Sequence, residues 1–460
     1  TRASALEAWQ TGEYQEAIQA YQALARRASA PAEIHRDLAR VLLEVGRTDE
    51  AKRHLQEAGG GPQLANVLGE LLLANGAWGA AEAAFRSAAS SWASDAVEAR
   101  ANLAELLWDR GRHAQALQLF YGFIDLYNQG GQLSAPELIA VGRAVRRLGV
   151  TNPQLFQDAL MAFDQAAQAA PGDPLPTILA GELFLDKYNA TEAHASFKKA
   201  LARNPKHPRA LLGEARALDF DGARGSADLI QQALATNPRS AAARVLLARL
   251  ALSAEDFETS FGEAAKALEV NPGSPDALAV LGAGHFLAGD WAAFEAAQDR
   301  ALAINPADAN FFTMVSEMSV RLRRYTEAAD MAAQGAALDS LSWSALGLLG
   351  MNQLRMGAIE QGRTNLERAF KGDPFNVWFK NTLDLLDTFS GYQTVHTQHF
   401  VLFLHGDESD LMAPYVGAIA EEAYAALRTQ YRTEPPTPIR LELFPRHADF
   451  SVRTLGLTGL

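Results

Sequence analysis

Prolines recur at nearly constant intervals through this chain. They stand at Pro171, Pro205, Pro238, Pro272, Pro306 and Pro374, so neighbours are 33 or 34 positions apart and the last interval is twice 34. Ser340 occupies the position of the missing proline. A fixed period of this length is typical of stacked helical repeats, in which each unit packs against its neighbours. The 460 residues therefore need not divide into several globular cores.

The composition excludes several classes of protein. It is 48% hydrophobic and 21% charged, which is globular rather than disordered. The net charge of −13 and the lack of a basic run argue against nucleic acid as a partner. No apolar run reaches the roughly 18 residues of a membrane span. The absence of cysteine rules out disulfides, thiolate zinc sites and cysteine nucleophiles.

The two ends of the sequence lead to expectations about processing and location. The chain opens on Thr1 rather than Met, so we expect a trimmed or processed N-terminus, and LGLTGL at 455–460 resembles the middle of a domain. The lack of cysteine suits an exported bacterial protein. A periplasmic or cell-surface location is therefore favoured over a cytoplasmic one.

Each period contains two helices. In residues 275–308, Leu281 and Phe286 recur at helical spacing, and Gly289 then breaks the helix. A second helix carries Phe294 and ends before Pro306, because the residue before a proline disfavours the α conformation. Small residues let the two helices approach closely.

These units resemble tetratricopeptide repeats. The small residue of the first helix is found as Ala39, Gly69, Ala104, Gly181, Ala248, Gly282 and Gly350. The glycine that ends the first helix is found as Gly12, Gly46, Gly76, Gly111, Gly289 and Gly357. The resemblance implies an all-α superhelical solenoid of about eleven helix-turn-helix repeats. A single helix at about 377–389 closes the stack.

The regular spacing is interrupted at 128–136, and a second, tighter joint is expected at 59–62. The segment 128–136 and the irregular repeat after it suggest a boundary between two stacks. We therefore expect an N-terminal stack at 1–130, a second stack with its closing helix at 131–391, and a different segment at 392–460.

The concave surface of such a solenoid supplies the candidate binding residues. In similar proteins the first helix of each repeat lines this groove. The candidate groove residues are Glu70, Glu105, Glu182, Glu214, Arg249, Glu317, Arg321 and Arg355. A row of carboxylates would favour a basic or amine-bearing partner, and the two arginines at the C-terminal end could clamp a carboxylate. The alternative is a solvated helix face in an acidic protein.

The last seventy residues follow another pattern. An apolar run at 399–405 fits a buried strand, 411–431 fits an amphipathic helix, and 439–444 alternates as a half-buried strand. We expect a small β-α-β segment, with no clear element in the last sixteen residues. Such a piece is too small for a core of its own, so it either docks on the solenoid or begins a larger domain.

This C-terminal segment is similar to the opening of peptidase-MA-like domains, which are gluzincin relatives often fused to tetratricopeptide repeats in bacteria. The matching features are the strand HFVLFLH, the EEAY helix, the PP turn and DFSVRT. The family places H-E-x-x-H on a later helix, where two histidines bind zinc and the glutamate is the base. No histidine of this chain is followed by Glu, and no phosphate-binding or nucleophile motif occurs elsewhere.

Two functions follow from the sequence. The first is a non-catalytic scaffold that binds a protein or peptide in the concave groove, without catalytic, cofactor or metal residues. The alternative is the substrate-recruiting arm of a zinc metallopeptidase-like protein, whose zinc and H-E-x-x-H would belong to a longer chain. A structural subunit of a larger assembly is a third possibility.

Overall fold

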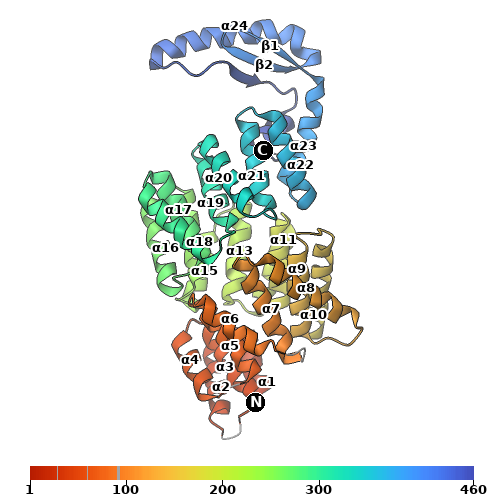
Figure 1. Cartoon of the computed structure of the whole chain (residues 1–460), viewed down its shortest axis with the longest axis vertical. Coiled ribbons are helices and arrows are strands. Elements are labelled where there is room, and N and C mark those ends of the chain that lie inside the picture. Colours follow the sequence, from red (N-terminus) through yellow and green to blue (C-terminus); the bar gives the residue numbers. More distant parts are fainter. Residues whose placement is uncertain (28–29, 60, 91–93, 460) are drawn as a thin grey trace. The chain divides into compact units, whose positions relative to one another are not determined.

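The computed structural model of the chain describes residues 1–27, 30–59, 61–90 and 94–459 (Figure 1). Contacts divide it into two compact units, Thr1–Ala345 and Leu346–Leu460. This division differs from the boundaries at 130 and 391 expected from the sequence, which remain predictions. The two units are described separately below.

The helices of the first unit form consecutive antiparallel pairs. They are α1 (Arg2–Gln10), α2 (Tyr14–Ala25), α3 (Ala32–Glu44), α4 (Thr48–Glu57), α5 (Pro62–Ala74), α6 (Trp78–Ala88), α7 (Ser94–Asp109), α8 (His113–Asn128), α9 (Ala135–Leu148), α10 (Leu155–Ala169), α11 (Leu175–Asp186), α12 (Ala190–Arg203), α13 (Pro208–Phe220), α14 (Ser226–Thr236), α15 (Ala241–Ser253), α16 (Phe257–Val270), α17 (Pro275–Ala288), α18 (Trp291–Ile304), α19 (Ala309–Arg321) and α20 (Tyr325–Leu338). The next pair is α21 (Trp343–Arg355), which crosses the division, and α22 (Ile359–Gly372). The predicted solenoid of eleven pairs is confirmed.

The pair α17 and α18 shows how the sequence sets the helix ends. The hydroxyl of Ser274 accepts a hydrogen bond from the third backbone N–H of α17, and Pro275 fills the first helical position, where no N–H is needed. Gly289 ends α17 in the left-handed conformation. Asp290 caps α18 in the same way as Ser274, and α18 ends at Asn305, before Pro306.

The small residues of the first helices provide space for phenylalanine rings. A Cβ atom on Gly69 would lie 2.4 Å from the ring of Phe85, and one on Gly282 would lie 2.4 Å from the ring of Phe311. Phe85 and Phe311 are almost fully buried. A larger residue at either glycine would overlap the ring and displace it, which costs roughly 1–3 kcal/mol in a packed core.

The turns inside the pairs adopt left-handed backbone geometry. All six glycines predicted to end a first helix have positive φ; these are Gly12, Gly46, Gly76, Gly111, Gly289 and Gly357. Tyr188, Glu255 and Arg323 occupy the corresponding turns of other pairs, with φ of 61°, 60° and 58°. Glycine adopts this geometry without steric cost, whereas other L-residues are strained by roughly 1–2 kcal/mol.

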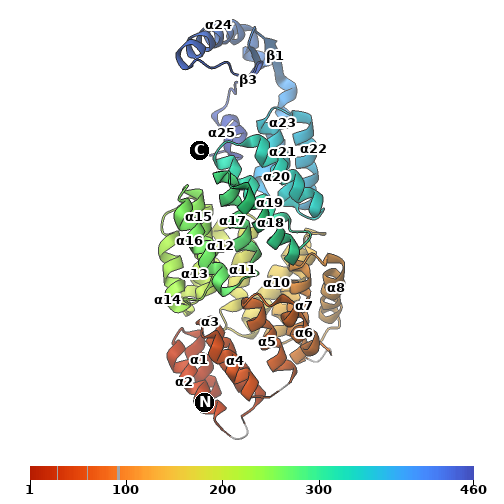
Figure 2. The same cartoon turned by 60° about the vertical axis from the view of Figure 1, so that its left-hand side comes forward.

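Successive superhelical turns of the first unit touch each other. The Asn204 side-chain amide donates to the carbonyl of Trp9 at 3.4 Å, although the two residues are 195 positions apart. Asn237 reaches Leu43 in the same way across 194 positions at 3.5 Å. Asn271 reaches Leu73 across 198 positions at 3.4 Å, and we call these three hydrogen bonds the inter-turn contacts. In both views the early repeats up to α6 adjoin the later repeats that begin at α13 (Figures 1 and 2).

Each inter-turn contact uses the asparagine that precedes a repeat proline. The asparagine receives a hydrogen bond from the backbone N–H two residues later, which fixes its side chain; for Asn271 this donor is Gly273, at 3.0 Å. Its oxygen then lies against a left-handed glycine of the earlier repeat. A Cβ on Gly76 would be 2.5 Å from the Asn271 oxygen. Glycine at this turn is therefore needed both for its φ and for the approach of the next superhelical turn.

The second unit continues with α22, the closing helix α23 (Val377–Asp387) and a 3-10 turn η1 (Thr388–Gly391). The following sheet has the order β1-β2-β3, from β1 (Tyr392–His396), β2 (Phe400–His405) and β3 (Ile439–Glu442). Strand β1 is antiparallel to β2, and β3 is parallel to it. Helix α24 (Gly406–Tyr431) connects β2 to β3. The predicted β-α-β segment is present, and β1 is an additional strand.

The last helix, α25 (His447–Leu455), lies where the sequence showed no clear element. Its C-terminal Gly456 carbonyl accepts a hydrogen bond from the Asn381 side chain of α23 at 3.0 Å. Arg453 donates to the carbonyl of Leu354 at 3.0 Å and pairs with Glu442 of β3. The α25 helix therefore docks on the closing helix within this unit, and both arrangements expected for the β-α-β segment stay predictions.

Helix α24 turns its small residues toward the sheet. Ala413 and Ala420 are buried, and Leu402 and Leu404 of β2 lie in the same core. The apolar positions that predicted an amphipathic helix lie on the other side. Leu411 and Ile419 are 68% and 66% exposed.

Candidate functional site

The predicted groove residues lie on the first helices of their pairs. Glu70 is on α5, Glu105 on α7, Glu182 on α11, Glu214 on α13 and Arg249 on α15, whereas Glu317 and Arg321 are on α19 and Arg355 is on α21. Arg355 falls in the second unit and is considered apart from the others.

Arginines of neighbouring first helices pair with three of the carboxylates. Arg40 of α3 lies 2.8 Å from Glu70, and Arg147 of α9 lies 2.6 Å from Glu105. Arg209 of α13 holds Glu182 through two hydrogen bonds of 2.7 Å. The surface of the first helices therefore carries interleaved charges of both signs.

The pairing alters the protonation of Glu182. Burial alone would raise its pKa, but the charge and hydrogen bonds of Arg209, together with the charge of Arg146, lower the pKa to about 2. Glu182 is therefore ionised throughout the physiological range. Arg209 itself keeps a side chain that is 48% exposed, so it can meet a second anion.

Glu214 occupies a different setting. Its carboxylate lies 2.9 Å from the Nδ1 atom of His194 on α12, and the residue is 5% exposed. Glu317 of α19, by contrast, is exposed. The five carboxylates that form a row in the sequence thus occupy unequal environments.

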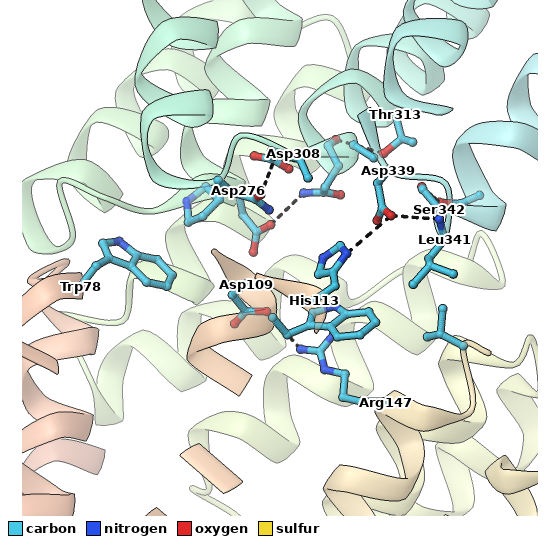
Figure 3. A pocket seen from close by; sticks show the side chains of 18 residues that line it. Trp78, Asp109, His113, Arg147, Asp276, Asp308, Thr313, Asp339, Leu341 and Ser342 are labelled. Atoms are coloured by element: carbon cyan, nitrogen blue, oxygen red, sulfur yellow. Dashed lines mark hydrogen bonds and ion pairs between the residues drawn. The ribbon is translucent and has the colours of Figure 1, made fainter. Parts of the chain in front are cut away.

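A cavity of about 420 Å³ lies between two superhelical turns of the first unit (Figure 3). One wall comes from the earlier repeats and includes Trp78, Trp108, Asp109, His113 and Arg147. The other comes from the later repeats and includes Asp276, Asp308, Asn310, Thr313 and Asp339. We call this space the acidic cavity. Its volume is in the range of small-ligand sites, roughly 300–1,000 Å³.

Two of its carboxylates have basic side chains as neighbours. Arg147 lies 3.2 Å from Asp109, and His113 lies 3.7 Å from Asp339. The His113 ring also stacks on Trp108, with 4.4 Å between centroids. These contacts order the earlier wall of the cavity.

The other two carboxylates lie on the later wall. Asp308 caps α19 through one oxygen, which accepts from the N–H of Phe311 at 3.2 Å. Its other oxygen, Oδ2, is buried and has no hydrogen-bond partner among the described residues. Asp276 accepts from the side chain of Asn310 at 3.1 Å. Neither has a cationic partner within the part of the chain that the structure describes.

Burial and mutual repulsion shift the protonation of these groups. Burial raises the pKa of Asp308 to about 6, against the N–H of Phe311, and the charge of Asp276 adds to the rise. Burial also raises the pKa of Asp109 to about 6, against the opposing charge of Arg147. Perturbed carboxyl groups gathered in a concavity are typical of binding sites.

Sequence reasoning missed the acidic cavity because its walls are distant in the chain. Asp109 and Asp308 meet only after the solenoid has completed a superhelical turn, so no local motif joins them. One signal was available at the helix caps. Ser240 and Ser274 cap the first helices of other repeats with neutral side chains, whereas Asp308 introduces a charge.

Within the described residues no three His, Asp or Glu side chains are grouped closely enough to hold a metal ion. No helix of the described chain is both long and apolar enough to cross a membrane. A second cavity of about 220 Å³ is mainly apolar and is lined by residues that include Ile124, Val141 and Met161.

Family comparisons identify the class of repeat. Residues 8–60 match one family model described as a tetratricopeptide repeat, and residues 66–130 and 178–224 match another of the same description. These segments are tetratricopeptide repeats, in agreement with the helix pairs of the fold. Such repeats are a class of protein-interaction module.

Solved structures with a similar arrangement share little sequence with this chain. Human IFIT1 in a dimer with PPP-AAAA is 16% identical, covers 76% of this chain and 93% of its own, and has a TM-score of 0.41. A tetratricopeptide repeat protein from Parabacteroides merdae is 15% identical, with coverage of 59% and 99% and a TM-score of 0.37. A chain of the APC/C hetero-tetramer Cut9–Hcn1 is 15% identical, covers 81% of this chain and 87% of its own, and has a TM-score of 0.35. No curated protein matches the sequence.

Proposed function

We propose that the chain is a non-catalytic scaffold that binds a protein or peptide partner along the first helices of its repeats. The observation behind this proposal is the half-buried row of charged side chains on those helices, from Arg40 through Glu70 and Glu105 to Glu182 and Arg209. Solenoids present such side chains on an extended concave surface, where peptides bind.

The ion pairs refine the expected chemistry of the partner. Glu182 keeps its negative charge, and half-exposed Arg209 remains accessible beside it. A partner with a basic side chain at Glu182 and an acidic one at Arg209 would extend this pair into a charge network. A purely basic partner, the expectation from the carboxylates alone, would have to compete with the arginines.

A peptide-display selection on the folded chain tests this proposal, followed by a charge reversal. We expect Glu182→Lys to weaken the selected peptides by about tenfold, on the order of 1.4 kcal/mol. Glu263 offers a matched control, because it is similarly buried and pairs with Arg244 at 2.8 Å but lies on the second helix α16. Equal losses for Glu182→Lys and Glu263→Lys, or no loss for either, would contradict binding on the first helices.

The metallopeptidase-associated role remains a second candidate because the predicted strand, helix and strand occur in the expected order. The EEAY motif has a structural role here: Glu421 lies 2.5 Å from the His399 ring, and the Tyr424 ring stacks on it. Reading the natural gene for a downstream H-E-x-x-H tests this candidate, and a gene without one would remove it.

A further inference from the structure

The acidic cavity carries more negative charge than its own residues neutralise. Asp109, Asp276, Asp308 and Asp339 contribute four carboxylates, whereas the basic side chains among the lining residues are Arg147 and His113. Arg147 is shared with Glu105 outside the cavity, at 2.6 Å. The cavity therefore retains a deficit of positive charge.

Asp308, on the later wall of the cavity, is a carboxylate without a cationic partner among the described residues. The residue is only 4% exposed, and its Oδ2 atom has no donor among the described residues. A buried carboxylate oxygen without a donor costs several times the value of an ordinary hydrogen bond, so natural structures rarely leave one unsatisfied. Asp276 repels it from the same side, because both lie on the later wall (Figure 3).

The remaining lining selects among cations. Trp78 supplies an indole ring, which attracts organic cations through its face. The ring of Trp108, by contrast, is already stacked by His113 at 4.4 Å and lies near the guanidinium of Arg147 at 5.7 Å. The Trp78 ring is fixed by a hydrogen bond from its Nε1 to the Gly273 carbonyl at 3.0 Å. The described side chains form no cluster that could hold a metal ion. Carboxylates beside aromatic rings in a space of this size fit an alkyl ammonium group better than a bare ion.

We propose that the acidic cavity binds a primary alkyl ammonium group, with Asp308 and Asp276 as its acceptors and the indole ring of Trp78 beside its alkyl chain. This chemistry is shared by small diamines and by a lysine side chain. The site shares Arg147 with the surface assigned to partner binding, through Glu105, but its two acceptors lie outside that surface and it does not depend on that assignment.

The protonation of the cavity supports this proposal. A bound ammonium would hold Asp308 and Asp109 ionised, although burial raises the pKa of each to about 6. Affinity should therefore fall as the pH drops through about 6. The other titratable and charged groups that line the same cavity are Arg147, His113, Asp276 and Asp339.

Calorimetric titration of the full chain with cadaverine tests the site, with pentanol as the uncharged comparison and a short lysine peptide paired with its norleucine analogue. We expect cadaverine or the lysine peptide to bind and neither uncharged compound to do so. Binding by cadaverine alone would identify a free amine, and binding by the peptide would identify a lysine side chain.

Asp308→Asn keeps the helix cap, because Asn caps as well as Asp, and removes the charge. We expect it to weaken ammonium binding by about tenfold or more. Asp256→Asn is the matched control, since Asp256 caps α16 in the same way outside the cavity, and we expect no change. Asp276→Asn gives a second variant if Asp308→Asn fails to fold.

Three outcomes would overturn the proposal. The first is no binding of either ammonium probe by the folded chain. The second is equal binding of pentanol and cadaverine, and the third is unchanged affinity in both Asp308→Asn and Asp276→Asn. The variant Glu182→Lys should leave cadaverine binding unaltered, so failure of the partner-binding surface and failure of this site are distinguishable.

Discussion

Some single residues destabilise the folded chain, and Asp308 is the clearest example. Its folded-state pKa of about 6 lies above the usual value of 3.8 for an aspartate, so the ionised form is disfavoured in the folded chain. The cost is fully present above pH of about 6 and is relieved as the folded state takes up a proton at lower pH.

Asp308→Asn should therefore stabilise the chain at neutral pH, by about 1–2 kcal/mol, and lose this advantage as the pH falls toward about 4. Urea denaturation across that range measures the effect. A variant that is less stable than the parent at pH above about 7 would show that the carboxylate is stabilised by the fold rather than strained by it.

Glu255 illustrates a second residue-scale cost. Its φ of 60° is the geometry that glycine provides at the corresponding turns, and the residue is exposed. Glu255→Gly should raise the free energy of unfolding by about 0.5–1 kcal/mol, because relief of strain exceeds the added flexibility of the unfolded chain. Gly46→Ala, the reverse change, should destabilise; a Cβ there would also lie 2.3 Å from the Asn237 oxygen. Thermal unfolding compares the stabilities of Glu255→Gly and Gly46→Ala with that of the parent chain. A Glu255→Gly variant less stable than the parent would show that the backbone at Glu255 is not strained.

At the scale of elements, the turn between β1 and β2 depends on α24. Glu421 accepts hydrogen bonds from the Thr397 hydroxyl at 2.6 Å and the His399 backbone at 2.7 Å. These bonds, the Thr397 hydroxyl foremost, lower the pKa of Glu421 to about 2. A lowered carboxyl pKa gives stability that is present above pH of about 4.5 and lost as the pH falls toward about 2.

Glu421→Ala should therefore remove the acid sensitivity of this turn and expose the His399 amide to solvent exchange. Hydrogen exchange at neutral pH measures it. Glu422→Ala is the control, because Glu422 neighbours Glu421 on α24 but makes none of these bonds. Persistent protection of His399 in Glu421→Ala would mean that the turn is held by other contacts.

The elements also show how far the sequence could lead. The proline period, the glycines with positive φ and the small residues opposite phenylalanine rings are local, so they predicted the eleven pairs and the closing helix. Tyr188, Glu255 and Arg323 depart from the glycine pattern, yet their turns keep the same left-handed geometry. Strand β1 was missed because only two of its five residues are half-buried and the other three are exposed. Helix α25 was missed because its packing partner α23 lies about seventy residues earlier.

At the scale of the first unit, the decisive property is the pitch of the superhelix. It brings residues about 194 positions apart into contact, through the inter-turn contacts of Asn204, Asn237 and Asn271. Pitch accumulates from small rotations over several repeats, so it leaves no motif in the sequence. The acidic cavity depends on this accumulated geometry, whereas the groove carboxylates Glu70, Glu105 and Glu182 pair with arginines of neighbouring repeats.

Asn204→Asp tests one inter-turn contact. Asn204 is 1% exposed, and its amide also donates to the Tyr14 hydroxyl at 3.1 Å. A carboxylate would face the Trp9 carbonyl without a donor, so we expect a loss of about 2–3 kcal/mol. Chemical denaturation compares the free energy of unfolding of Asn204→Asp with that of Asn271→Asp, because the amide of Asn271 donates to one carbonyl only. An Asn204→Asp variant as stable as the parent would contradict the contact.

Contact between successive superhelical turns is the central claim, because the acidic cavity exists only if it holds. Asp49 and Arg239 face each other across the turns at 3.7 Å, and the chain contains no native cysteine. The double variant Asp49→Cys/Arg239→Cys should form an intramolecular cross-link with a short bis-maleimide in nearly every monomer, whereas neither single variant should. Mass spectrometry of the monomer reads the result directly. Two free maleimide adducts in place of one bridge, in a chain of native helicity, would show that the turns do not meet and would contradict this account.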